Sequence, residues 1–275
     1  MNSLQIAILQ HNIVWHNPIA NQKLFEKQLN EIPKATTLVV LPEMWATGFT
    51  MKPEEVAETM DGPTMQWMKE MAKTQDTAIC GSLAIQEGND FYNRFVFVHP
   101  SAKLDTYDKV HPYTPSGESK IYRAGKTSAL IEYAGFRIRP LVCYDLRFPV
   151  FARNTDNYDL LLCVANWPAA RIQAWNALLR ARAIENMAYC IGVNRTGKDG
   201  YRLTYPGASA AYNALGDELI FMDEKDTTAS LNIDLDKASQ YTQQTSFFRR
   251  SRRLYFNINC SCSSQLARTS SCDSK

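Results

Sequence analysis

Short apolar runs recur along this chain, and they alternate with segments whose apolar residues have helical spacing. Residues 37–41 and 159–165 are continuous apolar runs of strand length, typical of strands that are buried on both faces of a sheet. Helices are expected over residues 17–32, 62–72 and 170–187, the first of which opens on an Asn-Pro capping pair. This alternation predicts an α/β protein in which helices cover a buried sheet.

The other expected elements are strands joined by short turns. Residues 78–85 and 91–99 are expected to pair as a hairpin, and a further strand ends near Lys109. In the helix over residues 170–187 one face is apolar, and Arg182 is expected on another face. Further strands are expected at residues 4–10, 128–132, 136–143, 189–194, 208–212, 218–222 and 229–233. Because no linker-like break or internal repeat interrupts these elements, they predict a mixed α/β sandwich in one domain.

Composition excludes several classes of protein. The 275 residues are 45% hydrophobic, enough for a sizeable core, and 30 basic against 28 acidic residues give no general field for a nucleic acid partner. No apolar stretch approaches membrane-spanning length, and the first residues lack the pattern of a signal peptide, so a soluble, non-secreted protein is expected. Seven scattered cysteines without a Cys-x-x-Cys pair favour a reducing compartment, the cytoplasm, and predict no metal site.

The C-terminal part differs from the rest in composition. Residues 258–275 are rich in Ser and Cys, and we expect them to be a disordered or non-native appendage to a domain that spans residues 1–257. Just before this tail, residues 247–253 combine two Phe with four Arg. Such a segment could contact phosphate, but a surface or subunit contact explains it equally well.

Three reactive side chains lie at the ends of expected strands. Glu43 and Cys143 each follow an apolar strand, and Lys109 ends a strand and opens a long polar loop. Because ligands of α/β proteins collect at the carboxyl ends of strands, these residues could converge despite their separation in sequence. Each also has a plain structural explanation. The cysteine could be an inert core residue, the glutamate a cap, and the lysine a surface partner of Asp108.

Acyl transfer at an amide is the chemistry that needs all three groups together. A thiol attacks as thiolate, which an ammonium favours and a carboxylate can generate by accepting the proton. The oxyanion then needs donors, which Lys109 and the backbone N–H of Tyr144 could supply. A Cys-His pair through His111 is the alternative. Local signatures of serine hydrolases, zincins and P-loop proteins are absent from the sequence.

Three blocks of sequence carry a family resemblance. Residues 41–44 (Leu-Pro-Glu-Met), 107–111 (Tyr-Asp-Lys-Val-His) and 143–149 (Cys-Tyr-Asp-Leu-Arg-Phe-Pro) resemble, in this order, the three catalytic blocks of the nitrilase (carbon-nitrogen hydrolase) superfamily. The resemblance extends over residues 1 to about 250. Within the superfamily, residues 43–49 and 165–171 are most similar to the omega-amidase branch, especially bacterial YafV-type amidases.

The resemblance implies a fold, a set of roles and a partner. It implies a four-layer αββα sandwich that pairs into homodimers or higher homo-oligomers and uses no metal or organic cofactor. Cys143 would be the nucleophile, Glu43 the general base and acid, Lys109 the oxyanion stabiliser, and Glu118 a second, supporting carboxylate. One position departs from many relatives, which carry Glu where this chain has Val150.

The implied substrate is a small amide, cleaved with water. Omega-amidases hydrolyse the terminal amide of short dicarboxylate monoamides such as 2-oxoglutaramate and 2-oxosuccinamate. Arg171 is the expected partner of the far carboxylate, although it could be a solvated arginine of a first helical turn. The aromatic walls of the pocket are expected to be formed by Phe49, Tyr113, Tyr144 and Trp167, although any of these could simply be a core residue. Another amidase, a nitrilase, or a catalytically silent binding protein on the same fold are the alternatives.

Overall fold

Two six-stranded sheets form the centre of the computed structural model, which describes residues 3–237. The first sheet has the order β14-β1-β2-β3-β4-β5. Its strands are β1 (Ser3–Gln10), β2 (Leu38–Val40), β3 (Ala78–Glu87), β4 (Asp90–Val98), β5 (Leu104–Asp108) and β14 (Thr227–Asp234). The second sheet has the order β13-β12-β9-β8-β7-β6. Its strands are β6 (Ile131–Tyr133), β7 (Phe136–Val142), β8 (Leu160–Ala165), β9 (Tyr189–Asn194), β12 (Ala210–Tyr212) and β13 (Glu218–Phe221).

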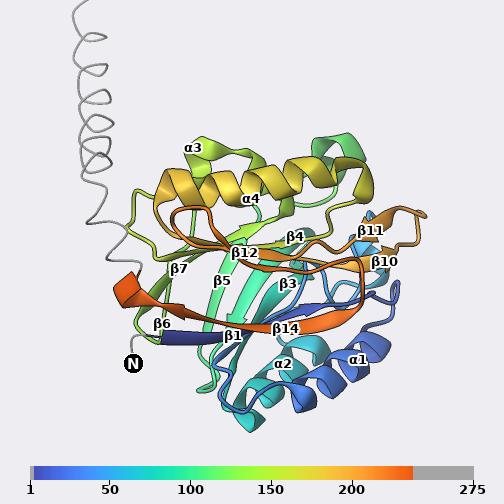
Figure 1. Cartoon of the computed structure of the whole chain (residues 1–275). Helices are drawn as coiled ribbons and strands as arrows, with labels where there is room; N and C mark the ends of the chain where they lie inside the picture. Colours follow the sequence, from blue (N-terminus) through green and yellow to red (C-terminus); the bar gives the residue numbers. More distant parts are fainter. Residues whose placement is uncertain (1–2, 238–275) are drawn as a thin grey trace, which may run out of the picture.

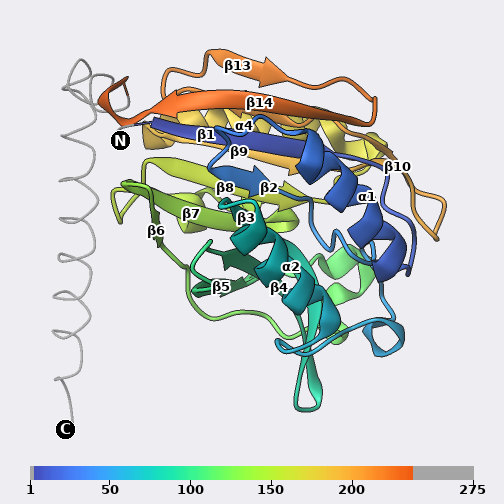
Figure 2. The same ribbon diagram turned by 90° about the horizontal axis from the view of Figure 1, so that it is seen from below.

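Helices cover the outer face of each sheet. The helices are α1 (Pro18–Glu31), α2 (Pro63–Thr74), α3 (Pro149–Ala152) and α4 (Ile172–Asn186). Asn17 caps α1 by accepting a hydrogen bond from the backbone N–H of Ala20 at 3.0 Å, as its position before Pro18 predicts. Helices α1 and α2 lie side by side on the first sheet, and α4 runs across the second (Figures 1 and 2).

Three apolar layers hold these elements together. Between the sheets, side chains such as Phe97 of the first sheet and Leu162 of the second are completely buried. Phe25 and Met68 pack α1 and α2 against the first sheet, and Trp175 packs α4 against the second. The order helix, sheet, sheet, helix confirms the predicted four-layer αββα sandwich. Met65 and Met68 of α2 are core residues, as expected, and Met71 packs against the same core while partly buried.

Strand directions bring distant segments to one edge of the sandwich. Strands β1, β2 and β3 are parallel to one another, and so are β7, β8 and β9. Because β4 is antiparallel to both β3 and β5, β5 runs in the direction of β3. The carboxyl ends of β2, β5, β7 and β8 are followed directly by the segments that carry Glu43, Lys109, Cys143 and Asn166.

The structure differs from the sequence-based expectations at three places. The strand expected at 128–132 is the shorter β6, and residues 196–206 form an unexpected hairpin of β10 (Thr196–Lys198) and β11 (Thr204–Pro206). Arg182, expected away from the core, is buried because its guanidinium reaches the backbone carbonyl of Leu146 beside α4. The valine at position 150 lies in α3, directly after Pro149, with 74% of its surface exposed.

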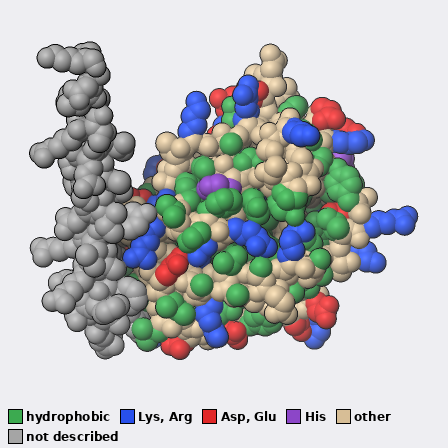
Figure 3. All heavy atoms as spheres, turned by 90° about the horizontal axis from the view of Figure 1, so that it is seen from above, with side chains coloured by type: hydrophobic (Ala, Val, Ile, Leu, Met, Phe, Trp, Pro, Cys, Tyr) green, Lys and Arg blue, Asp and Glu red, His purple; other side chains and the backbone are tan. Residues whose placement is uncertain are grey.

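The C-terminal expectations fall beyond the part of the chain that the structure describes. The predicted domain end at residue 257, the basic segment 247–253 and the tail 258–275 all lie outside residues 3–237. Among the described helices, none combines the length and the apolar character required to cross a membrane. The face above α4 carries basic, acidic and apolar side chains interspersed (Figure 3).

Candidate active site

Glu43 is completely buried just after β2, and its carboxylate is held by three donors. Its Oε1 accepts hydrogen bonds from Nζ of Lys109 at 3.0 Å and from Nδ2 of Asn93 at 2.7 Å. Its Oε2 accepts one from the backbone N–H of Asn166 at 2.7 Å, while the Asn166 side chain donates to the Glu43 carbonyl at 2.6 Å. The carboxylate is therefore fixed between the two sheets. It does not cap the next segment, which was the structural alternative considered for Glu43.

Lys109 lies between two carboxylates with 1% of its side chain exposed. Besides Glu43, its Nζ contacts both oxygens of Glu118, at 3.0 and 2.9 Å. Burial by itself acts to lower the pKa of Lys109, but the charges of Glu118 and Glu43 outweigh burial and hold the pKa well above its usual range. Lys109 is thus a buried ammonium and does not pair with Asp108, which binds Arg94 instead.

Glu118 is the second carboxylate of this group. It lies in the 3₁₀ turn Glu118–Lys120, is completely buried, and accepts a hydrogen bond from the backbone N–H of Tyr113. Burial raises its pKa above the ordinary value, even though Lys109 acts in the opposite direction. Glu118 and Glu43 contact the same ammonium, so together they fix where it points.

Cys143 follows β7 directly and opens the 3₁₀ turn Cys143–Arg147. Its φ of +48° is the left-handed conformation that residues other than glycine rarely adopt, and such strain is common at functional sites. Burial raises the pKa of the thiol well above its ordinary value, Glu43 raises it further through charge and a hydrogen bond, and Lys109 opposes both. These effects favour the thiol form of Cys143 at rest, with the Glu43 side chain beside it.

A network of uncharged polar side chains fixes the Glu43 carboxylate from β3 and β4. Asn93 bridges the two carboxylates, with Nδ2 at 2.7 Å from Glu43 and 3.2 Å from Glu118. Its Oδ1 accepts a hydrogen bond from the hydroxyl of Ser82 at 2.8 Å, and that hydroxyl accepts one from the backbone N–H of Met44 at 2.9 Å. Both residues are buried in strands. Neither was predicted from the sequence, although a polar Asn inside the apolar strand 91–98 was an available signal.

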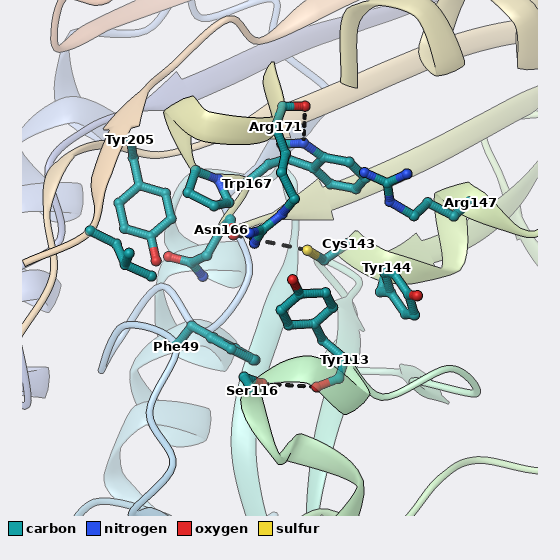
Figure 4. A pocket seen from close by; sticks show the side chains of 12 residues that line it. Phe49, Tyr113, Ser116, Cys143, Tyr144, Arg147, Asn166, Trp167, Arg171 and Tyr205 are labelled. Atoms are coloured by element: carbon teal, nitrogen blue, oxygen red, sulfur yellow. Dashed lines mark hydrogen bonds between the residues drawn. The ribbon is translucent and has the colours of Figure 1, made fainter. Parts of the chain in front are cut away.

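A pocket opens above the Cys143 sulfur. Figure 4 shows Phe49, Tyr113, Tyr144 and Trp167 around Cys143, so all four expected aromatic residues line it. Only Trp167 is also a core residue, with 2% of its surface exposed. The lining further contains residues that the sequence analysis did not single out as pocket residues: Ser116, Arg147, Asn166, Pro168, Leu203 and Tyr205.

Among the described residues that line this pocket there are two arginines and no acidic side chain. Arg171, at the end of the 3₁₀ turn Ala169–Arg171, lies over the ring of Tyr113 at 4.7 Å and points into the space above Cys143 (Figure 4). Arg147 lies over the Trp167 ring at 5.1 Å. Among the described residues neither guanidinium forms an ion pair with a carboxylate. The pocket therefore has a positive lining suited to an anionic ligand.

The side chain of His111 is engaged by residues other than Cys143. Its Nδ1 contacts Asp145 at 2.8 Å, and its ring stacks on Phe148 with centroids 3.7 Å apart. The structure thus gives no support to the alternative Cys-His pair. Within residues 3–237 there is also no cluster of three or more His, Cys, Asp or Glu that could hold a metal ion.

The comparisons with known proteins agree with this geometry. The family model described as carbon-nitrogen hydrolase matches residues 5–243. The chain belongs to this family. Omega-amidase YafV of Escherichia coli strain K12 is 42% identical over 228 residues, which make up 83% of this carbon-nitrogen hydrolase and 88% of that enzyme. The predicted superfamily and enzyme class are confirmed.

Two further relatives of this carbon-nitrogen hydrolase extend the comparison. The 2-oxoglutaramate amidase of Bacillus subtilis strain 168 is 29% identical over 248 residues, or 88% of this chain and 95% of that enzyme. A CN-hydrolase superfamily protein of Xanthomonas campestris, whose crystal structure carries an arsenic adduct in the active site, is 37% identical. It superposes with a TM-score of 0.87, covering 89% of this chain and 95% of that one.

Proposed function

We propose that this carbon-nitrogen hydrolase is an omega-amidase that cleaves the terminal amide of short dicarboxylate monoamides to acid and ammonia. The observation that carries the proposal is the pocket itself. A thiol lies next to the buried Glu43 and Lys109, while the walls carry two arginines that form no ion pair with a carboxylate of residues 3–237. The first set of groups suits acyl transfer, and the second suits a substrate with a carboxylate at its far end.

In the first half of the reaction, the thiol of Cys143 attacks the amide carbonyl and gives its proton to Glu43. The oxyanion of the tetrahedral intermediate is stabilised by the Lys109 ammonium and the backbone N–H of Tyr144. Glu43 then passes the proton to the amide nitrogen, the C–N bond breaks, and ammonia leaves. The carbonyl carbon remains bound to sulfur as a thioester.

In the second half, Glu43 accepts a proton from water while the water oxygen attacks the thioester. The same donors stabilise the second oxyanion. When the C–S bond breaks, Glu43 returns the proton to the sulfur, and the acid leaves. Glu118 does not exchange a proton in this scheme; its contacts of 3.0 and 2.9 Å keep the ammonium of Lys109 in place.

For the substrate we propose 2-oxoglutaramate or 2-oxosuccinamate, with Arg171 as the partner of the carboxylate. Support comes from the direction of its side chain in Figure 4 and from the relatives named omega-amidase and 2-oxoglutaramate amidase. Phe49, Tyr113, Tyr144 and Trp167 would hold the carbon chain between them. Arg147 lies at the same pocket and is a second candidate for the carboxylate or the oxo group.

Ammonia release from 2-oxoglutaramate by purified protein tests this function. The Cys143→Ala variant should lose activity by about 1,000-fold or more, because no other group can form the thioester. Activity that survives this substitution would overturn the nucleophile assignment. A matched nitrile assayed beside the amide separates amidase from nitrilase, and a protein that turns over neither is either an amidase for another substrate or the silent binding protein.

Thiol labelling provides an independent check on Cys143. Of the four free cysteines in residues 3–237, Cys80, Cys163 and Cys190 are buried, and Cys143 alone is partly exposed. Iodoacetamide at low concentration should therefore modify Cys143 ahead of these three, as peptide mapping by mass spectrometry can show. Equal labelling of all four would contradict the proposed site.

We also propose that the enzyme acts in the cytoplasm as a homodimer or higher homo-oligomer. The three buried thiols, which are free rather than paired, support a reducing compartment. Analytical ultracentrifugation of the full chain measures the oligomeric state, and a monomer at micromolar concentration would contradict the dimer.

A further inference from the structure

Asp145 lies two residues after the nucleophile, is completely buried, and makes four hydrogen bonds. Its Oδ2 accepts from the hydroxyl of Tyr107 at 2.7 Å and from the backbone N–H of Val142 at 3.0 Å. Its Oδ1 accepts from the backbone N–H of His111 at 2.9 Å and from Nδ1 of the same residue at 2.8 Å. Both oxygens are thus fully occupied, and no Lys or Arg among the described residues pairs with this carboxylate.

The groups that donate hydrogen bonds to Asp145 come from two segments that the proposed reaction must hold close together. Tyr107 and His111 lie two residues before and two residues after Lys109, whereas Val142 immediately precedes Cys143. One carboxylate therefore joins the segment of the ammonium to the turn of the nucleophile. The Tyr107 hydroxyl also accepts a hydrogen bond from the backbone N–H of Val110 at 3.2 Å, which closes the loop around Lys109.

We propose that Asp145 is a positioning residue that holds the nucleophile turn, residues 143–147, against the Lys109 segment. The backbone of Cys143 has a φ of +48°, and a strained conformation persists only where its surroundings determine it. The bond from the Val142 N–H to Asp145 spans this strained residue. Loss of the carboxylate would let the turn relax and move the sulfur relative to the ammonium.

His111 and Arg182 hold the same turn from outside. The His111 ring stacks on Phe148 at 3.7 Å and meets Phe151 edge-on at 4.9 Å, so it clamps the residues that follow the turn. From α4, Arg182 donates to the carbonyl of Leu146 from Nε at 3.1 Å and from Nη2 at 2.7 Å. His111, which the proposed reaction does not use, thus has a role in positioning.

The test compares Asp145→Asn, Tyr107→Phe and His111→Gln with a matched control, Asp159→Asn. The carboxylate of Asp159 also accepts a backbone hydrogen bond, from the N–H of Arg137 at 2.9 Å, but it precedes β8 at the strand end opposite the pocket. Two readouts are needed: kcat and KM for ammonia release, and the rate at which iodoacetamide alkylates Cys143. Circular dichroism and thermal unfolding verify that each variant is folded.

For Asp145→Asn we expect kcat to fall by about 100-fold, with KM changed less than about threefold, since a displacement of about 1 Å can have this effect. Alkylation of Cys143 should change by about tenfold for the same reason. Tyr107→Phe and His111→Gln each remove one side-chain hydrogen bond to Asp145, together with the other contacts of the hydroxyl or the ring, and should lower kcat by about 3- to 10-fold. Asp159→Asn should match the wild type in both readouts.

Several outcomes would overturn the proposal. The first is a folded Asp145→Asn variant whose kcat and alkylation rate match the wild type. The second is an Asp145→Asn variant that loses thermal stability while kcat and alkylation stay unchanged, because a purely structural role of Asp145 predicts that result. If Asp145→Asn does not fold, unchanged kcat and alkylation in the two partner variants refute the proposal. The kcat readout rests on the proposed amidase function. The alkylation readout does not depend on that function. A wild type that is inactive on amides would therefore refute the amidase function, while alkylation would still test the positioning role of Asp145.

Discussion

At the scale of single residues, the site is a buried row of charges, carboxylate, ammonium and carboxylate, next to a thiol. The ammonium of Lys109 contacts Glu43 and Glu118 at 2.9 to 3.0 Å, and both carboxylates are fully buried. Removing the central charge would leave two like charges without compensation in a dry interior. Lys109 therefore has two separable roles, one in holding the fold and one in the proposed stabilisation of the oxyanion.

Lys109→Met should separate these roles. We expect the free energy of unfolding to fall by about 3 kcal/mol at pH 7, as is typical when one partner of a buried ion pair is removed, and the amidase activity to be lost. Adding Glu118→Gln should recover part of the stability, because it removes one of the two repelling charges, but no activity. Chemical denaturation and ammonia release measure the two effects. Recovered activity in the double variant would refute the role of Lys109 in catalysis.

The two pocket arginines lead to a prediction about substrate binding. A hydrogen bond to a charged group contributes about 1.5–3 kcal/mol, so Arg171→Gln should raise KM for 2-oxoglutaramate by about 10- to 100-fold. An uncharged amide of similar length, such as butyramide, should be affected far less. The same pair of assays on Arg147→Gln decides which guanidinium binds the carboxylate. If both variants keep the wild-type KM for the charged amide, neither arginine recognises it.

At the scale of elements, the sequence predicted what local patterns determine and missed what distant contacts determine. The apolar strands that precede Glu43 and Cys143 were visible as runs of buried residues, and strand ends correctly located the three reactive groups. The hairpin β10-β11 was missed because residues 196–206 have no alternating pattern and are rich in turn formers. Burial of Arg182 was missed because its partner, the carbonyl of Leu146, is 36 residues away.

The missed hairpin forms one wall of the pocket through Leu203 and Tyr205. Asp199 shapes it: Oδ1 accepts hydrogen bonds from the N–H groups of Tyr201 and Leu203, both at 2.9 Å, and Oδ2 accepts one from the Tyr205 hydroxyl at 2.7 Å. The hydroxyl of Tyr201 also accepts a bond from the N–H of Met51 at 3.2 Å, near Phe49 on the facing wall. The turn of this hairpin is therefore bonded both to Tyr205 of the pocket lining and to the segment that follows Phe49.

Asp199→Ala should loosen this wall, raising KM by about 3- to 10-fold through the loss of up to three hydrogen bonds, while kcat changes little. The matched control is Asn213→Ala. The Asn213 side chain accepts bonds from the N–H groups of Leu215 at 2.9 Å and Asp217 at 3.0 Å in the turn between β12 and β13, which does not line the pocket. Steady-state kinetics should show a raised KM for Asp199→Ala alone. An equal rise in both variants would mean that general destabilisation, rather than the pocket wall, is responsible.

At the scale of the whole molecule, β14 closes the fold by returning to pair with β1 along its full length, from Ser3 opposite Asp234 to Gln10 opposite Thr227. His11 lies at the end of this pairing, is 5% exposed, and is hydrogen-bonded through Nε2 to Thr228 at 3.2 Å. Its ring also packs edge-on against Phe25 of α1 at 5.9 Å. One titratable side chain thus joins the first strand, the last described strand and the first helix.

Burial lowers the pKa of His11 below its ordinary value of 6.5, although the charges of Asp226 and Glu31 act in the opposite direction. Below pH 6.5 the unfolded chain therefore binds a proton that the folded chain resists, so the free energy of unfolding should fall as the pH drops from 6.5 through the folded pKa. Above pH 6.5 His11 is uncharged in both states, so the stability that is lost at lower pH is fully present. Urea denaturation between pH 7.5 and 5 should show a smaller decrease for His11→Gln than for the wild type, because glutamine fills the site without titrating. Parallel decreases in the two proteins would show that other groups determine the acid stability of the fold.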